Sequence, residues 1–148
     1  PYKYRRVYPS VPFKILDAPG YSDDFYHNIL DWSVKNCIVI GLGKAIYVYN
    51  FGTAKVSKLF QLGDDEEVCS LKWSPQGEYL SVGTNLGDVM IFDTESEKKV
   101  RTLKGHEGRT SAAAWSNKLL STGGKDRMIY HRDLRCAKDY VSESRAHK

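Results

Sequence analysis

Two short phrases recur along the chain at an interval of about 41 residues, and this repeat limits the fold more than any other feature. A tryptophan followed by serine occurs three times, and the successive tryptophans are 41 and 42 residues apart. A β-prone phrase ending in Asn or Asp follows each tryptophan and recurs 43 and then 40 residues apart. Two independent landmarks with one period indicate a tandem array of one supersecondary unit. The landmarks are Trp32, Trp73 and Trp115, and the phrases 46–50, 89–93 and 129–133.

The middle unit shows what each repeat contains. Short runs rich in β-branched, aromatic and aliphatic residues predict strands at 68–73, 78–83, 89–92 and 99–103. Turn residues separate these runs, with Pro and Gly in 74–77 and Asn and Gly in 85–87. No helical period longer than two turns occurs. The sequence therefore predicts an all-β protein in which each unit is one four-stranded blade of a WD40 β-propeller.

The repeat also divides the chain. We expect an N-terminal arm at 1–24, three blades at 25–62, 63–104 and 105–144, and the start of a fourth at 145–148. A propeller needs at least four blades, because each sheet buries its faces against its neighbours around a ring. The chain is therefore expected to be a fragment of a longer protein.

The third unit carries residues that can form a hydrogen-bonded network. A His, a strand hydroxyl and a turn Asp can link the turns of a blade, and the candidates are His106, Ser121 (or its neighbour Thr122) and Asp126. The Trp that should complete such a network is replaced by Arg132, so a partial network is expected. We interpret these residues as scaffold.

The first 50 residues carry a narrower signature. The phrase Pro12-x-x-Ile15-Leu16-Asp17-Ala18-Pro19 is followed by Asp23-Asp24-Phe25-Tyr26-x-Asn28 and then by Asp31-Trp32-Ser33. Together with 101–106 and 131–135, this strongly resembles the Fizzy and Fizzy-related family, the WD40 activators of the anaphase-promoting complex. The resemblance runs from Arg6 to Lys148.

The resemblance implies a seven-bladed ring, of which this chain would supply about three blades, and a stretch at 11–17 that pairs with the last blade. It also implies a degron receptor and activator of that ubiquitin ligase in cell-cycle control. The implied partners are subunits of the complex, degron-bearing substrates and pseudosubstrate inhibitors, and the implied localisation is nucleus and cytoplasm.

The resemblance also assigns residues to two peptide sites. Asp17 would face the Arg of a destruction box, while Leu16, Ile40 and Val56 would line the pocket for its Leu. Asp24 would contact a Lys-Glu-Asn degron. Each residue has a plainer reading, because Asp17 could be a turn former, Asp24 a solvated carboxylate, and the three apolar residues core.

Other classes of function are disfavoured. No nucleophile or acid–base pair stands in a catalytic context, and no metal site or cofactor is expected, because the four His and three Cys are scattered singly. A net charge of +4 without a basic stripe makes nucleic acid an improbable partner, and no run of 18 apolar residues suggests a membrane span. The alternative is a WD40 scaffold that binds other proteins or RNA, but such a scaffold has no reason to carry the phrases at 16–19 and 24–26.

Overall fold

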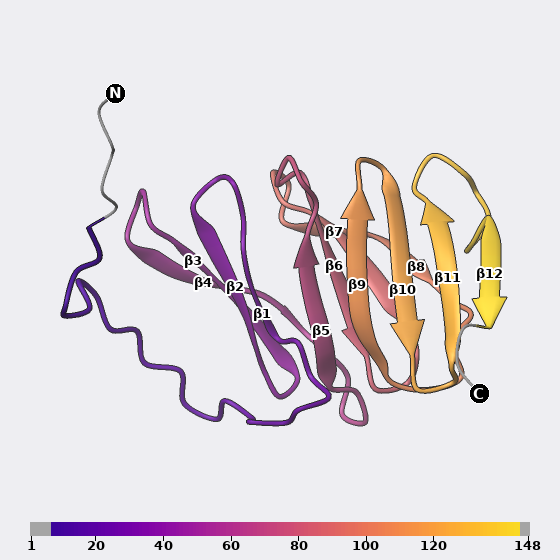
Figure 1. Ribbon diagram of the computed structural model, residues 1–148, viewed down its shortest axis with the longest axis horizontal. Helices are drawn as coiled ribbons and strands as arrows, with labels where there is room; N and C mark the ends of the chain where they lie inside the picture. The colour runs from indigo at the N-terminus through magenta and orange to yellow at the C-terminus, as the bar shows by residue number, and fades with distance from the viewer. Residues whose placement is uncertain (1–6, 146–148) are drawn as a thin grey trace.

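The computed structural model describes residues 7–145, and it contains three four-stranded antiparallel sheets that stand side by side (Figure 1). In each sheet the strands are neighbours in chain order. Among the described residues no helix is long and apolar enough to cross a membrane. The first sheet comprises β1 (Leu30–Trp32), β2 (Cys37–Leu42), β3 (Ala45–Asn50) and β4 (Lys55–Gln61); the second β5 (Val68–Trp73), β6 (Tyr79–Thr84), β7 (Val89–Asp93) and β8 (Lys98–Leu103); the third β9 (Thr110–Ser116), β10 (Leu119–Gly124), β11 (Met128–Asp133) and β12 (Ser142–Arg145).

These sheets confirm the all-β fold and the four-stranded repeat. The predicted blades at 25–62, 63–104 and 105–144 each contain one sheet, except that β12 extends to Arg145. Residues 1–6 of the predicted arm and residues 146–148 of the predicted fourth unit lie outside the described part of the chain.

The burial patterns follow from the position of each sheet. The second sheet has a neighbour on both faces, so β5 and β7 are buried along nearly their whole length and read as continuous apolar runs. In β2 and β9 burial alternates, as expected for strands with one covered face. One core cluster joins the first and second sheets around Val39, Leu71 and Phe92, and a second joins the second and third sheets around Ile91 and Leu120.

Glycine permits the closest approach between neighbouring sheets. Gly41 in β2 lies against β5, where a Cβ would be 2.8 Å from Val68 Cγ1. Gly83 occupies the same place in β6, where a Cβ would be 2.5 Å from the carbonyl oxygen of Thr110 in β9. Real Cβ atoms do not approach other atoms so closely, so any side chain here would force the sheets apart.

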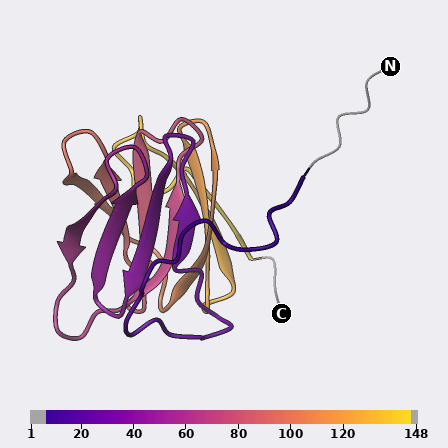
Figure 2. The same ribbon diagram turned by 90° about the vertical axis from the view of Figure 1, so that its left-hand side faces the viewer.

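The segment before β1 contains no strand among residues 7–29. It runs alongside the first sheet (Figures 1 and 2), and the side chains of Val11, Phe13 and Ile15 in the predicted ring-closing stretch are at least 69% exposed. Asn28 fixes the end of this segment, because its N–H donates to Cys69 O at 2.9 Å and its carbonyl accepts from Leu71 N at 2.8 Å. The residues just before Asn28 are therefore held beside β5.

Candidate functional site

An apolar groove lies between the N-terminal segment and the face of the first sheet that points away from the second. We call it the first-sheet groove; its volume is about 780 Å³. The structure brings Leu16, Asp17, Ile40 and Val56, the four residues assigned to destruction-box binding, into this one groove. Its other lining residues are Ile15, Ala18, Pro19, Leu30, Ile38, Leu42, Tyr47 and Tyr49.

The sheet wall of the groove results from strand alternation and register. Ile38, Ile40 and Leu42 are alternate residues of β2, so they share one face of the sheet. Leu30 and Tyr47 are the direct cross-strand partners of Ile40 on either side. The family motif did not name these neighbours, although the alternation of β2 would have indicated Ile38 and Leu42.

The opposite wall combines an apolar side chain with a carboxylate. Leu16 is 41% exposed, and the Asp17 side chain is in the exposed class. Within residues 7–145, no hydrogen bond or ion pair involves the Asp17 carboxylate. A carboxylate without a partner beside an apolar surface can accept a guanidinium and an aliphatic side chain from one peptide.

Aromatic and cationic contacts fasten the segment next to this wall. Lys14 Nζ lies 4.7 Å from the centre of the Tyr49 ring and also donates to the Tyr49 hydroxyl. Phe13 contacts Phe51, which in turn stacks on Trp32 with ring centres 4.9 Å apart. These contacts anchor the chain two residues before Leu16 and three before Asp17.

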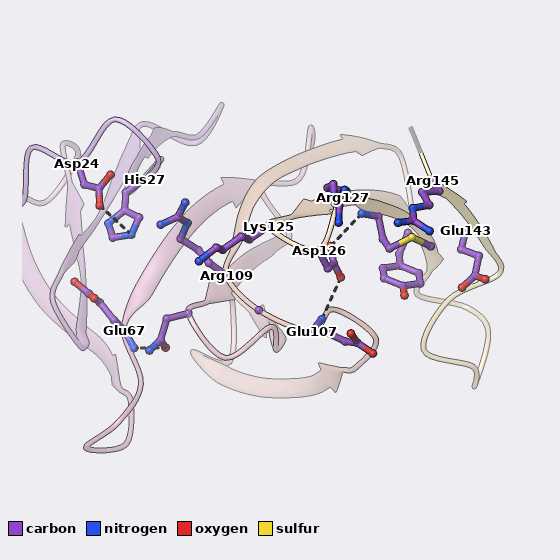
Figure 3. Close-up of a pocket in the computed structure, with 14 residues that line it drawn as sticks. Asp24, His27, Glu67, Glu107, Arg109, Lys125, Asp126, Arg127, Glu143 and Arg145 are labelled. Atoms are coloured by element: carbon purple, nitrogen blue, oxygen red, sulfur yellow. Dashed lines mark hydrogen bonds and ion pairs between the residues drawn. The ribbon is translucent and has the colours of Figure 1, made fainter. Parts of the chain in front are cut away.

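A second hollow, which we call the polar pocket, lies at one end of the three sheets and has a volume of about 890 Å³ (Figure 3). It is lined by Asp24, His27, Glu67, Asn85, Glu107, Gly108, Arg109, Lys125, Asp126, Arg127, Met128, Tyr130, Glu143 and Arg145. Residues from all three repeats therefore meet there, and charged side chains of both signs predominate. Such a lining suits a polar peptide of mixed charge.

Asp24, the residue assigned to Lys-Glu-Asn binding, stands at the N-terminal side of the polar pocket. Its Oδ1 accepts a hydrogen bond from Tyr26 N at 2.8 Å, and its Oδ2 lies 3.7 Å from His27 Nε2. The Asp24 side chain is 37% exposed, so it can still meet a ligand, whereas the His27 side chain is only 8% exposed. The position of Asp24 is thus fixed while its carboxylate remains accessible.

The network of the third repeat differs from the expected one in two members. His106 Nδ1 lies 2.9 Å from Asp126 Oδ2, as predicted, but His106 Nε2 lies 3.0 Å from the hydroxyl of Thr122 and not from Ser121. Ser121 points to the other face of β10 and bonds His131 Nδ1 at 2.8 Å. Of the two candidate hydroxyls, Thr122 therefore belongs to the network and Ser121 does not, because adjacent strand residues face opposite sides.

Arg132 joins the network, although its Nη2 is buried with no hydrogen-bond partner among the described residues. Its guanidinium is fully buried; Nε donates to the Thr122 hydroxyl at 3.0 Å, and one terminal nitrogen donates to Lys104 O and Asp139 O. Burial lowers the pKa of Arg132 from its usual value. The network therefore ties β10 and β11 to the segments before β9 and before β12.

The ionisable pair in this network is also shifted. Burial lowers the pKa of His106, and this effect outweighs the contribution of Asp126. Burial raises the pKa of Asp126, but hydrogen bonds from the Met128 and Glu107 backbone N–H groups and from His106 outweigh it, so the pKa is below its usual value. Within residues 7–145, no group of three or more His, Cys, Asp or Glu side chains is arranged to hold a metal ion.

We expect Thr122→Val to lower the free energy of unfolding by about 1–2 kcal/mol, because the change removes the hydroxyl that His106 Nε2 and Arg132 Nε share, and both are buried. Ser121→Ala is the matched control, since it removes the adjacent hydroxyl on the other face of β10 and should cost less than about 1 kcal/mol. Urea unfolding of both variants measures the difference. Equal losses would contradict the network as described.

Comparison with known proteins identifies the family. The family described as the anaphase-promoting complex subunit 4 WD40 domain matches residues 36–118. The chain is 48% identical to the B-type cell cycle switch protein ccs52A of Medicago truncatula and 45% identical to Protein FIZZY-RELATED 2 of Arabidopsis thaliana. Both comparisons cover 100% of this chain and 31% of the relative. The anaphase-promoting complex subunit cdc20 of Dictyostelium discoideum is 42% identical over 98% of this chain and 29% of its own length.

Solved structures agree with these relatives. A chain in the crystal structure of the mitotic checkpoint complex superposes with a TM-score of 0.91 at 39% identity, covering 93% of this chain and 43% of that chain. The structure of U3-55K superposes with a TM-score of 0.71 at 19% identity, which shows a shared fold only. The chain spans about a third of the length of the curated relatives it matches. Its predicted membership of the Fizzy and Fizzy-related group is confirmed. The chain belongs to the family described as the anaphase-promoting complex subunit 4 WD40 domain.

Proposed function

We propose that this chain is the degron-recognition part of an activator subunit of the anaphase-promoting complex, and that it acts in cell-cycle control as a binding protein rather than as an enzyme. The observation that carries the proposal is the first-sheet groove. The groove is lined by Leu16, Ile40, Val56 and Asp17, whose carboxylate has no partner within residues 7–145. The names of the relatives, which include a cell cycle switch protein and a subunit of the complex, support the same proposal.

The groove has the chemistry that an Arg-x-x-Leu peptide requires. The Arg guanidinium can form a charge-assisted pair with Asp17, and the Leu side chain can enter the apolar space between the segment and β2. A short peptide must be ordered when it binds, so we expect modest affinity. The polar pocket is proposed to bind the second degron class, with the Lys of Lys-Glu-Asn against Asp24.

Partners and localisation are part of the same proposal. We infer that the partners are subunits of the anaphase-promoting complex, degron-bearing substrates and pseudosubstrate inhibitors. The similarity to a chain of a mitotic checkpoint complex supports a checkpoint inhibitor among them. The proposed localisation is nucleus and cytoplasm, where such partners would be met.

The test uses two labelled peptides, one with an Arg-x-x-Leu motif and one with Lys-Glu-Asn, titrated with the full chain by fluorescence anisotropy. Asp24→Asn should weaken the binding of the Lys-Glu-Asn peptide about tenfold, because the peptide ammonium loses its ion pair. Binding of the Arg-x-x-Leu peptide should not change.

Asp23→Asn is the matched control, because it removes the same charge one residue earlier from a side chain in the exposed class. It should leave both affinities unchanged. Equal weakening of both peptides by Asp24→Asn would indicate a folding defect and contradict the assignment. Failure of the unaltered chain to bind either peptide would contradict the proposed function, and would favour a WD40 scaffold for other partners.

A further inference from the structure

We propose that Arg109 is the residue of the polar pocket that binds a carboxylate of the peptide, next to the lysine that Asp24 would bind. This inference rests on the proposed function and adds a specificity-determining residue to it. It starts from an arginine at the centre of the pocket whose side chain is oriented by the protein while its terminal nitrogens remain unused.

The backbone and side chain of Arg109 are both held in place. Its carbonyl accepts a hydrogen bond from Lys125 N at 2.9 Å, and the next residue, Thr110, is fully buried. Its Nε donates to the Ser111 hydroxyl at 3.0 Å. Its guanidinium carbon lies 4.7 Å from the centre of the Tyr26 ring. The guanidinium is thus oriented before any ligand arrives, which reduces the entropy lost on binding.

The terminal nitrogens of Arg109 form no hydrogen bond or ion pair within the described part of the chain. A guanidinium offers several N–H donors in a planar fork that matches a carboxylate. Arg109 therefore retains the donors that a bidentate pair with a carboxylate needs. Figure 3 shows Arg109 and Lys125 between the Asp24–His27 pair on one side of the pocket and the turn at Asp126 on the other.

Tyr26 connects the proposed cation site to the proposed anion site. Its backbone N–H donates to Asp24 Oδ1 at 2.8 Å, while its ring supports the guanidinium of Arg109. Tyr26 thus contacts both charged groups, and both groups line the same pocket. A lysine followed by a glutamate carries the two charges that complement Asp24 and Arg109.

Other charges of the pocket act on the same ligand. Lys125 adds positive potential beside Arg109, whereas Glu67 and Glu107 also line the pocket and would repel an incoming carboxylate. The preference for a peptide carboxylate should therefore depend on its direct pairing with Arg109 rather than on the net charge of the pocket. A variant that removes a positive charge elsewhere should not abolish this preference.

The experiment measures the ratio of two affinities. Peptides with Lys-Glu-Asn and Lys-Gln-Asn are titrated with the full chain and with Arg109→Gln by fluorescence anisotropy. The unaltered chain should bind the Glu peptide roughly tenfold more tightly than the Gln peptide, and Arg109→Gln should bring this ratio close to one. Lys98→Gln, which removes one exposed positive charge from β8, should retain the tenfold ratio.

Each result bears on the inference separately from the proposed function. A ratio near one in the unaltered chain, or a ratio that survives in Arg109→Gln, overturns the inference alone. Failure of the unaltered chain to bind either peptide overturns both the inference and the proposed function. Unchanged binding of the Arg-x-x-Leu peptide by Arg109→Gln shows that this variant is folded, and loss of both peptide classes overturns the specific role of Arg109.

Discussion

Replacing Trp73 by alanine is expected to lower the free energy of unfolding by about 3–5 kcal/mol, the usual cost of removing a buried aromatic side chain. Trp73 ends β5, is 7% exposed and belongs to the core cluster between the first and second sheets. Its Nε1 also donates to Asp31 O at 3.3 Å, and its backbone N–H donates to Asp31 Oδ2 at 2.8 Å. Trp73→Ala would remove the Nε1 hydrogen bond to Asp31 together with the packing of the indole in the core cluster.

Trp32 provides a matched control for this variant, because it occupies the same place in the preceding repeat. It is 55% exposed, and its main neighbour is the stacked ring of Phe51. We expect Trp32→Ala to cost about 1 kcal/mol, the value of one aromatic pair. Urea unfolding followed by circular dichroism measures both. If the two variants lose similar free energy, the placement of Trp73 in the core is wrong.

Asp17→Asn is expected to weaken the binding of an Arg-x-x-Leu peptide about thirtyfold. A hydrogen bond between two charged groups contributes about 1.5–3 kcal/mol, which corresponds to a factor of ten to a hundred or more in affinity. Because the Asp17 side chain is exposed and has no partner within residues 7–145, its replacement should leave the unfolding midpoint unchanged. Fluorescence anisotropy with the labelled peptide gives the affinity, and a thermal melt gives the stability.

The comparison with Asp24→Asn makes the Asp17 result specific. Asp17→Asn should leave the Lys-Glu-Asn peptide unaffected, whereas Asp24→Asn should affect that peptide alone. A peptide in which the Arg is replaced by Gln should bind the unaltered chain and Asp17→Asn equally. An Asp17→Asn variant that still prefers the Arg peptide would refute the assignment of Asp17 to the groove.

The strands of the second sheet could be predicted closely from the sequence. Predicted bounds of 68–73, 78–83, 89–92 and 99–103 differ from β5 to β8 by at most one residue at each end. Turn residues at 74–77 and 85–87 separate short apolar runs, and both faces of this sheet are covered, so local and tertiary preferences agree. Because the landmarks recur about every 41 residues, the same four-stranded unit is predicted for the other two sheets.

The choice between Ser121 and Thr122 could not be predicted in the same way. The two hydroxyls are adjacent in β10, and each can accept or donate a hydrogen bond. Only the register decides between them, since it pairs Ser121 with His131 and Thr122 with Tyr130. A slip of one residue would exchange their faces, and no apolar alternation in this strand marks the covered side.

The role of Arg132 was missed for a different physical reason. A charged side chain is rarely buried without a carboxylate, so an arginine in place of the expected tryptophan suggests an exposed residue and an incomplete network. The structure instead supplies carbonyl groups from Lys104 and Asp139. These acceptors come from loops whose paths the sequence does not indicate.

The glycines of β2 and β6 have a consequence for how such a chain can grow. Gly41 and Gly83 give neighbouring repeats their clearance through the absence of a side chain, whether the opposing residue is Val68 or Thr110. The spacing between successive repeats therefore depends on one position in β2 and one in β6 that carry no side chain. A gene that duplicates one unit copies the clearance with it, so a new module can join the array before any contact has been optimised.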